Sequence, residues 1–342
     1  MADHPMDGDD RRGGDGADKT EATDDGGERG RSADDPRQVP AKGWKDIVAR
    51  TAKQMKADNV ILMAAGVAFY ALLSLVPALV AMISIYGLVA DPAEITKQVD
   101  DALAAAPAEV RDLLSEQMTS VTEQSSGGLG LALGLSIALA VWSASGGMKH
   151  LMTAITVAYD EEESRGFFAL RGTAILLTVG AVVFVVGAIG VITVVPALLA
   201  DTSLGGAAQL AVSIARWPLL GLGLMAGLAV LYRYGPDRDQ PQWSWTGPGS
   251  IVAVILWLIA SIAFSFYTAN FSSYGETYGS LGAVVVLMLW LMISAAAVII
   301  GAEINAEAEH QTRSDTTTGE SKPMGRRDAE VADTAGASTD DR

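Results

Sequence analysis

The sequence predicts an all-α integral membrane protein: a six-transmembrane helical bundle with disordered acidic termini and a helical first external loop. Three observations predict this class. Half of the residues are hydrophobic and the mean hydropathy is +0.28, although the net charge is −16. The apolar residues come in blocks of about 20 to 30, which is the length that a helix needs to cross a bilayer. These blocks are continuous, whereas a membrane barrel would alternate apolar and polar residues.

Six apolar blocks are predicted to be membrane spans and to form one membrane domain over residues 42–312. Each is expected to be helical, because a helix satisfies all of its backbone polar groups within the lipid. Pro77, inside the first block, lacks a backbone N–H and therefore predicts a kink. The spans are expected at about residues 60–90, 129–158, 170–199, 211–232, 248–267 and 281–301.

The two ends of the chain have a different composition. Residues 1–41 and 313–342 are rich in Asp, Gly, Ser and Thr and hold few large apolar residues. Such segments bury too little apolar surface to offset the entropy that is lost on ordering. They are therefore predicted to be disordered cytoplasmic tails whose outer parts are not needed for membrane insertion.

Lysine and arginine are concentrated in alternate connections between the predicted spans. The positive-inside rule places such connections in the cytoplasm. The sequence thus predicts a multi-pass protein of the plasma (inner) membrane with both termini cytoplasmic. The residues that support this orientation are Lys42, Lys45, Arg50, Lys53, Lys56, Lys149, Arg165, Arg171, Arg233, Arg238 and Arg313.

The first external connection, residues 91–128, is long enough to hold structure of its own. Pro92 and Pro107 each suit the first turn of a helix. After Pro107, apolar residues recur at helical spacing. We therefore expect two amphipathic helices here, which either cap the bundle or lie at the outer surface.

The last external connection reads "NFSSYGETYGS" between two apolar blocks. It has no Lys or Arg, as expected on the translocated side. Two interpretations stay open. The segment is a surface turn, or Tyr274, Glu276 and Tyr278 fold inwards as an external gate or ligand contact.

Charged and amide side chains cluster at one predicted membrane depth, the inner ends of the spans. They are Asp58, Asn59, Lys149, Arg171, Arg233, Glu303 and Asn305. Polar residues in spans cost free energy in lipid and tend to be functional. They are either ordinary anchors and helix caps, or a polar cluster in which Lys149 or Arg171 pairs with Asp58 or Glu303.

Polar residues also occur near the predicted midplane. Tyr70, Ser74 and Pro77 are spaced to share one face of the first span, and Trp142 and Ser143 lie in the second span. Interrupted helices and midplane polar groups recur in transporters. Helix packing explains these residues equally well.

Several stretches together resemble the YihY/BrkB family of bacterial inner-membrane proteins, also called ribonuclease BN-like. They include "AAGVAFYALLSLVPALVAMISIYGL", "VWSASGGMKHLMTAITVAY", "LYRYGPD" and "GAEINAE", in this order over about residues 42–312. The resemblance implies a six-helix integral membrane protein. This chain departs from the family pattern at Thr156, where the family more often has Asn.

The residues predict no catalytic, cofactor or metal site. There are no cysteines, and the histidines His4, His150 and His310 are scattered. The acidic run at residues 160–163 is typical of a solvated loop. No basic, aromatic patch suggests nucleic acid. We therefore expect a protein that is not an enzyme, and a ribonuclease role has no support in these residues.

The predicted function is transport or translocation of an envelope amphiphile or small solute. The alternative is a non-transporting envelope scaffold, and a membrane-bound hydrolase ranks third. A continuous polar path lined by Tyr70, Ser74, Ser143 and Lys149 would favour transport. The expected partners are the lipid bilayer and a lipid or small-molecule ligand, and self-association into a homo-oligomer stays open.

Overall fold

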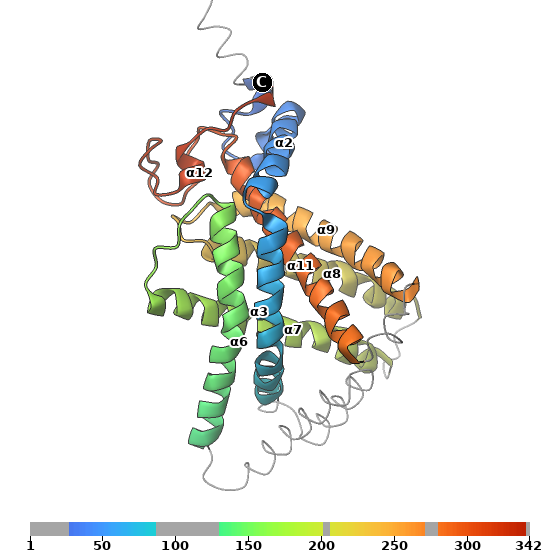
Figure 1. Ribbon diagram of the computed structural model, residues 1–342. Coiled ribbons are helices and arrows are strands. Elements are labelled where there is room, and N and C mark those ends of the chain that lie inside the picture. Colours follow the sequence, from blue (N-terminus) through green and yellow to red (C-terminus); the bar gives the residue numbers. More distant parts are fainter. Residues whose placement is uncertain (1–26, 87–129, 201–205, 271–279, 340–342) are drawn as a thin grey trace, which may run out of the picture.

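The computed structural model describes residues 27–86, 130–200, 206–270 and 280–339, and the elements of these ranges are helices. Long helices occupy the positions of the predicted spans, in the expected order (Figure 1). They are α3 (Val60–Tyr86), α6 (Gly130–Ala158), α7 (Phe167–Ala200), α8 (Gly206–Tyr234), α9 (Trp243–Asn270) and α11 (Ser280–Glu309). The shorter elements are η1 (Pro36–Gln38), α2 (Ala41–Ala57) and α12 (Glu330–Asp333).

Within the described ranges, 4 of these helices are long and apolar enough to cross a membrane. The spanning stretches are Phe167–Ile192, Leu210–Tyr234, Trp243–Thr268 and Val284–Glu309. A fifth is added if Ala41–Ala57 and Val60–Leu75 are one broken span. The all-helical, membrane-integral class is thus confirmed, while the count of six spans stays a prediction.

The chain bends by 64° between α2 and α3. Asn59 makes this bend possible, because its φ of 52° lies in the left-handed region, which Asn tolerates better than most residues. Its side-chain amide donates to the carbonyl of Ala57 at 3.2 Å. Asp58 therefore lies at a helix break and not on a straight span.

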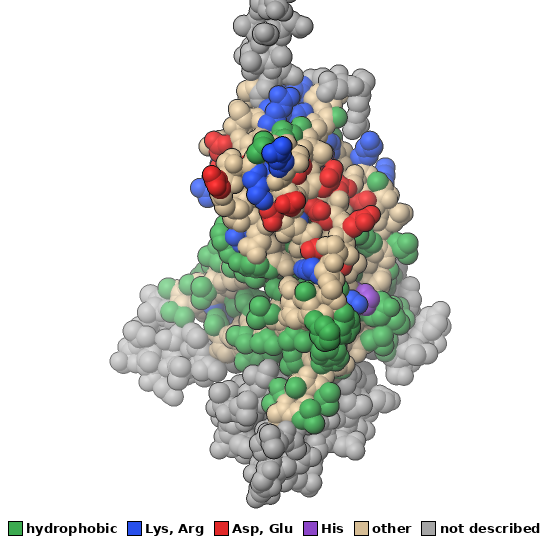
Figure 2. Space-filling view, turned by 90° about the vertical axis from the view of Figure 1, so that its left-hand side faces the viewer, with side chains coloured by type: hydrophobic (Ala, Val, Ile, Leu, Met, Phe, Trp, Pro, Cys, Tyr) green, Lys and Arg blue, Asp and Glu red, His purple; other side chains and the backbone are tan. Residues whose placement is uncertain are grey.

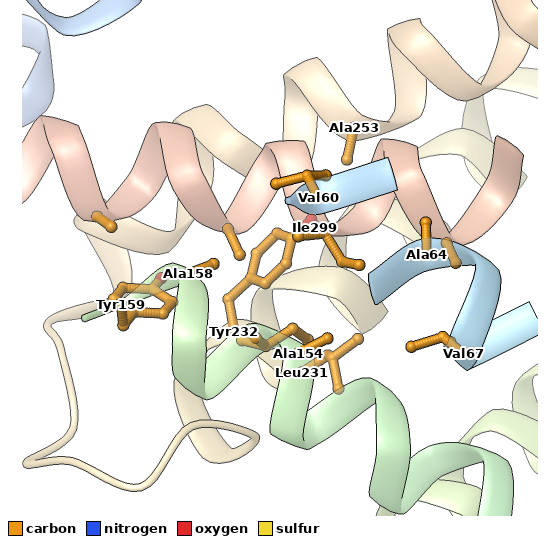
Figure 3. Packing of buried hydrophobic residues seen from close by; sticks show 14 of the residues in the cluster. Val60, Ala64, Val67, Ala154, Ala158, Tyr159, Leu231, Tyr232, Ala253 and Ile299 are labelled. Carbon is orange, nitrogen blue, oxygen red and sulfur yellow. The ribbon is translucent and has the colours of Figure 1, made fainter. Parts of the chain in front are cut away.

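The long helices pack through small residues. α3 contacts α6 and α11, and α9 contacts α8 and α11 (Figure 1). At the centre of the core, Tyr232 of α8 lies close to Val60 and Ile299 (Figure 3). Its hydroxyl donates to the carbonyl of Val298 at 2.8 Å. The same buried cluster includes alanines, whose small side chains let the helices approach closely, among them Ala64, Ala154, Ala158 and Ala253.

The outer faces of α7, α8 and α9 are apolar and exposed. Val183, Leu222 and Ile262 keep 59%, 62% and 70% of their surface accessible. Figure 2 shows hydrophobic side chains around the lower part of the described molecule and charged ones gathered at its upper end. Such a belt suits contact with the lipid bilayer.

The charged end is a folded unit that we call the polar cap: residues 27–57, the loop 235–242 and residues 303–339. Arg29 pairs with Asp46 at 2.7 Å and Arg50 with Glu307 at 2.5 Å, with all four side chains nearly or fully buried. The hydroxyl of Thr339 donates to Asp46 at 2.6 Å.

The prediction of disordered tails is therefore wrong for residues 27–41 and 313–339. The prediction from composition did not hold because these segments are ordered by buried ion pairs and hydrogen bonds and do not depend on a large apolar core. The first external connection and the residues 271–279 lie outside the described ranges, as do residues 1–26.

Candidate functional site

The carboxy-terminal end of α11 is the centre of the polar cap. Glu309 pairs with Arg238 at 2.8 Å, and both side chains are fully buried. The Thr316 hydroxyl donates to the same carboxylate at 2.7 Å. The Arg238 guanidinium lies 4.9 Å from the centre of the Tyr159 ring. These contacts satisfy a charge pair that would otherwise be costly to bury.

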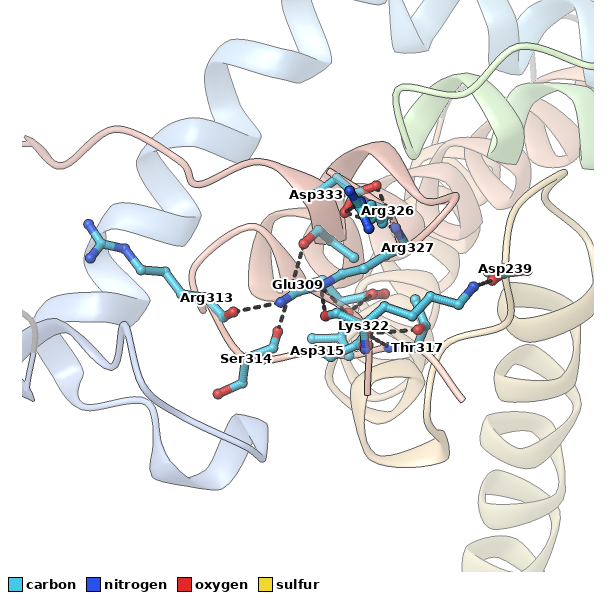
Figure 4. Close-up of polar contacts among 12 residues, drawn as sticks. Asp239, Glu309, Arg313, Ser314, Asp315, Thr317, Lys322, Arg326, Arg327 and Asp333 are labelled. Atoms are coloured by element: carbon cyan, nitrogen blue, oxygen red, sulfur yellow. Dashed lines mark hydrogen bonds and ion pairs between the residues drawn. The ribbon is translucent and has the colours of Figure 1, made fainter. Parts of the chain in front are cut away.

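The segment after α11 is held by charged hydrogen bonds (Figure 4). Asp315 accepts from the backbone N–H of Thr317 at 3.0 Å and of Lys322 at 2.7 Å. The Lys322 ammonium reaches Asp239 in the loop 235–242 at 2.7 Å. Arg327 donates to the carbonyls of Arg313 and Ser314 at 2.9 and 3.1 Å. The loop 235–242, which joins α8 to α9, and the segment after α11 are thus bonded to each other.

Glu303 of α11 is fully buried, and its carboxyl lies against the carboxyl of Asp58. Its charged neighbours are all acidic: Asp58 acts on it most strongly, followed by Asp160 and Glu307. Two carboxyls that share a buried site do not both ionise readily. Within the described ranges, no group of three or more His, Asp or Glu side chains could hold a metal ion.

The predicted ion pairs at this depth do not form. Arg171 stacks on Trp142, with its guanidinium 4.4 Å from the ring centre, and donates to the carbonyl of the same residue. Among the described residues, no ion pair involves Lys149. The sequence spacing predicts that these groups lie at one membrane depth. The rotation of α11 about its axis, however, directs the Glu303 side chain towards Asp58.

Asn305 has a structural role. Its side-chain oxygen accepts from the N–H of Gly249 at 2.7 Å, and its amide donates to the carbonyl of Thr246 at 3.3 Å. Both partners belong to the first turns of α9, next to Pro248, which supplies no N–H. The side chain therefore ties α11 to the first turns of α9.

The midplane residues do not line one polar path. Tyr70 is 41% exposed and stacks on His150, with the ring centres 3.5 Å apart. Ser74 accepts from the N–H of Gly147 at 2.9 Å, so it joins α3 to α6. Trp142 and Ser143 face outwards. Pro77 stays inside α3 without ending the helix. The gate residues Tyr274, Glu276 and Tyr278 lie outside the described ranges.

A cavity of about 790 Å³ lies between α6, α7 and α8 and is closed at one end by the loop 235–242. We call it the α7–α8 cavity. Its walls are mostly apolar, with Leu176, Phe184 and Leu224 among them, and its polar groups gather at the cap end. The cationic residues in this wall are Arg165, Arg233 and Arg238.

A second cavity, of about 390 Å³, lies between α3, α6 and α7. It is lined by apolar side chains apart from Ser74 and Thr178. Met148 and Ala181 line both cavities, so the two spaces lie on either side of these side chains. A methionine is flexible enough to open or close such a boundary.

The loop between α6 and α7 closes the cap end of the α7–α8 cavity. Arg165 pairs with Glu163 at 2.7 Å and with Asp237 at 3.6 Å. Asp237 accepts from the N–H and the hydroxyl of Ser164, each at 2.7 Å. Burial by itself would raise the pKa of Asp237, but these hydrogen bonds and the Arg165 charge outweigh it and lower the pKa.

Sequence reasoning did not single out this cavity. It used Arg165 and Arg238 only to orient the chain, and it placed Arg233 among the polar residues at the inner ends of the spans. The stretch "LYRYGPD", which carries Arg233 and Asp237, was the available signal. A cavity wall is assembled from helices far apart in the sequence, so no local pattern reveals it.

Comparison with known proteins gives consistent matches. The family model described as "Virulence factor BrkB" matches residues 51–325. The ribonuclease-like protein YfkH of Bacillus subtilis is 34% identical over 259 residues, which are 71% of this chain and 87% of that protein. A UPF0761 membrane protein of Vibrio campbellii is 28% identical over 269 residues, or 75% of this chain and 81% of that protein. No solved structure matches.

Proposed function

This chain belongs to the Virulence factor BrkB family of membrane proteins, and from this premise we propose that it binds an amphiphile and translocates it across the membrane. The observation that carries the proposal is the α7–α8 cavity. Its volume of about 790 Å³ falls within the range of typical ligand sites. The proposed activity is not enzymatic. "Ribonuclease-like" is part of the name of the Bacillus protein and is said of that protein only.

The lining of the cavities favours an amphiphile over a small polar solute. A polar solute or ion needs partners that replace its water. The second cavity offers two hydroxyl side chains in an otherwise apolar lining, and Ser74 already accepts a hydrogen bond from the backbone of α6. An amphiphile instead presents apolar chains to apolar walls and needs polar partners at one end only.

The proposed route runs from the α7–α8 cavity past Met148 into the second cavity. The cap end of the molecule is proposed to face the cytoplasm, because Lys and Arg concentrate in its connections. Labelling of a cysteine introduced at Ala41 by a membrane-impermeant reagent tests this orientation, since intact cells should protect it.

The route can be tested by filling the α7–α8 cavity. A Cβ at Gly227 would meet no atom within 4 Å, so Gly227→Leu should fold and occupy the cavity. We expect it to abolish protein-dependent flipping of a fluorescent phospholipid in proteoliposomes. Gly221→Leu is the matched control, because Gly221 lies on the same helix with equally open space but outside the cavity wall.

Equal flipping by the two glycine variants, with wild-type thermal stability, would exclude this route. Absence of flipping by the wild-type protein across a range of lipids would exclude translocation. That result would favour the alternative, an envelope scaffold. The folded polar cap, which presents charged side chains away from the apolar belt, is the observation that supports the scaffold (Figure 2).

A further inference from the structure

Arg233 differs from the other two arginines in the wall of the α7–α8 cavity. Arg165 is neutralised by Glu163 and Asp237, and Arg238 by Glu309. Within the described part of the chain, Arg233 forms no ion pair. Only 8% of it is exposed, and its Nε has no hydrogen-bond partner there. A buried guanidinium without an anion is costly.

Aromatic rings place this guanidinium at the level of lipid headgroups. It lies 4.6 Å from the ring centre of Trp243 and 5.6 Å from that of Tyr234. The two rings are 52% and 39% exposed. Tryptophan and tyrosine concentrate at the membrane–water interface, where such half-exposed rings are stable. One Nη of Arg233 donates to the carbonyl of Pro241, which fixes the position of the side chain.

From Arg233 the cavity continues between α7 and α8 along apolar residues, including Leu176, Phe184 and Leu224. The site therefore offers one unpaired cation at the headgroup level and an apolar channel behind it. This combination matches the shape of a lipid, with a charged head on acyl chains. A soluble anion would use the cation but leave the apolar part of the cavity empty.

We propose that Arg233 binds the phosphate of an anionic phospholipid whose acyl chain occupies the α7–α8 cavity. A guanidinium can donate two parallel hydrogen bonds to a phosphate, which an ammonium cannot. Basic pockets between spanning helices on the cytoplasmic side are typical sites for anionic headgroups. The proposal names the substrate class of the proposed function and rests on it for translocation, whereas binding can be measured separately.

The test is lipid binding to the purified full-length protein in nanodiscs or detergent. Quenching of tryptophan fluorescence by brominated phosphatidylglycerol and phosphatidylcholine with matched chains gives the preference for the anionic head. We expect wild type to prefer phosphatidylglycerol by about tenfold or more, because the choline ammonium of phosphatidylcholine offsets the phosphate charge that Arg233 binds. Arg233→Gln should remove this preference, and Arg233→Lys should keep part of it.

Arg171→Gln is the matched control, because Arg171 also stacks on a tryptophan but lies outside the cavity wall. It should retain the preference. Gly227→Leu should weaken binding of both lipids. Soluble glycerol phosphate should not displace the lipid at equal concentration.

A folded Arg233→Gln or Arg233→Lys protein with the full wild-type preference would refute the headgroup site, as would displacement by glycerol phosphate. Selective binding without flipping would leave this site standing and refute translocation. Flipping that does not depend on Arg233 would refute the headgroup site as part of the route and leave translocation standing.

Discussion

Asp160, two residues after the end of α6, shows how a single charge beside the polar cap affects stability. Its φ of 56° is left-handed, a conformation that Asp and Asn tolerate. Its carboxylate accepts from the side-chain amide of Gln54 in α2 at 2.8 Å. Burial, and then the nearby carboxylates of Asp58 and Glu307, raise the pKa of Asp160. The native state therefore binds the Asp160 proton more tightly than the unfolded chain does.

The pKa of Asp160 is higher in the folded protein than in the unfolded chain. The free energy of unfolding therefore falls as the pH rises from the unfolded pKa to the folded pKa. At neutral pH the Asp160 charge therefore destabilises the protein. We expect Asp160→Asn to melt at a higher temperature than wild type at neutral pH. The difference should vanish once the pH falls below the unfolded pKa of Asp, about 3.9. Thermal unfolding across a pH series measures this.

Asn keeps both the tolerated backbone conformation and an acceptor for Gln54, so the substitution changes little besides the charge. Asp160→Ala is the control, because it removes the charge and the hydrogen bond together. A lower melting temperature of Asp160→Asn at neutral pH would contradict the proposed effect of the acidic neighbours.

At the scale of elements, the crossing of α9 and α11 depends on two glycines. A Cβ at Gly301 would lie 2.7 Å from the carbonyl oxygen of Gly249 and 2.8 Å from the Cβ of Ala253. It would also collide with the hydroxyl of Tyr232. Backbones this close leave no room for a side chain, as at other small-residue crossings in membranes.

We expect Gly301→Ala to destabilise the protein by about 1 to 3 kcal/mol, the usual cost of overpacking a close contact. The Cβ would meet a backbone oxygen of α9 and the Cβ of Ala253, and neither can move without moving the backbone of α9. Thermal unfolding of the purified protein measures the loss. Gly190→Ala is the control, because its Cβ would meet nothing within 4 Å. If both variants unfold at the wild-type temperature, the helices can separate without cost and the crossing is not a tight constraint.

At the scale of the whole molecule, the polar cap joins the two ends of the chain. Arg50 of α2 bonds Glu307 at 2.5 Å and donates to the carbonyl of Ala337 at 3.2 Å. The backbone N–H of Gly336 donates to the carbonyl of His310 at 2.9 Å. α2 is thus held between α11 and the carboxy-terminal segment.

Removing residues 313–342 should therefore lower stability while leaving insertion intact, because no long helix is deleted. The truncation leaves Arg50, Asp46 and Glu309 each without one partner. We expect a lower melting temperature and faster proteolysis of α2 in membrane vesicles. A variant lacking residues 1–26 is the control for chain length. Unchanged protection of α2 in the truncated protein would show that the cap does not depend on the tail.

The sequence by itself determined the helical membrane class and the order and positions of the long helices. These follow from the length of the apolar blocks, which is a local property of the sequence. It also identified Asp58, Glu303 and Asn305 as unusual, because polar residues near a span need a reason to be there.

Only the tertiary structure decided what those residues touch. Asn305 ties α11 to the first turns of α9, and Glu303 lies against Asp58 and not Lys149, because the spacing of residues in one segment does not determine how packed helices are rotated. The order of residues 313–339 and the α7–α8 cavity arise in the same way. Each depends on contacts between residues that are far apart in the sequence, such as Arg238 and Glu309, which are 71 residues apart. Local composition predicts only how a segment behaves by itself. It leaves out the free energy of contacts with distant parts of the chain.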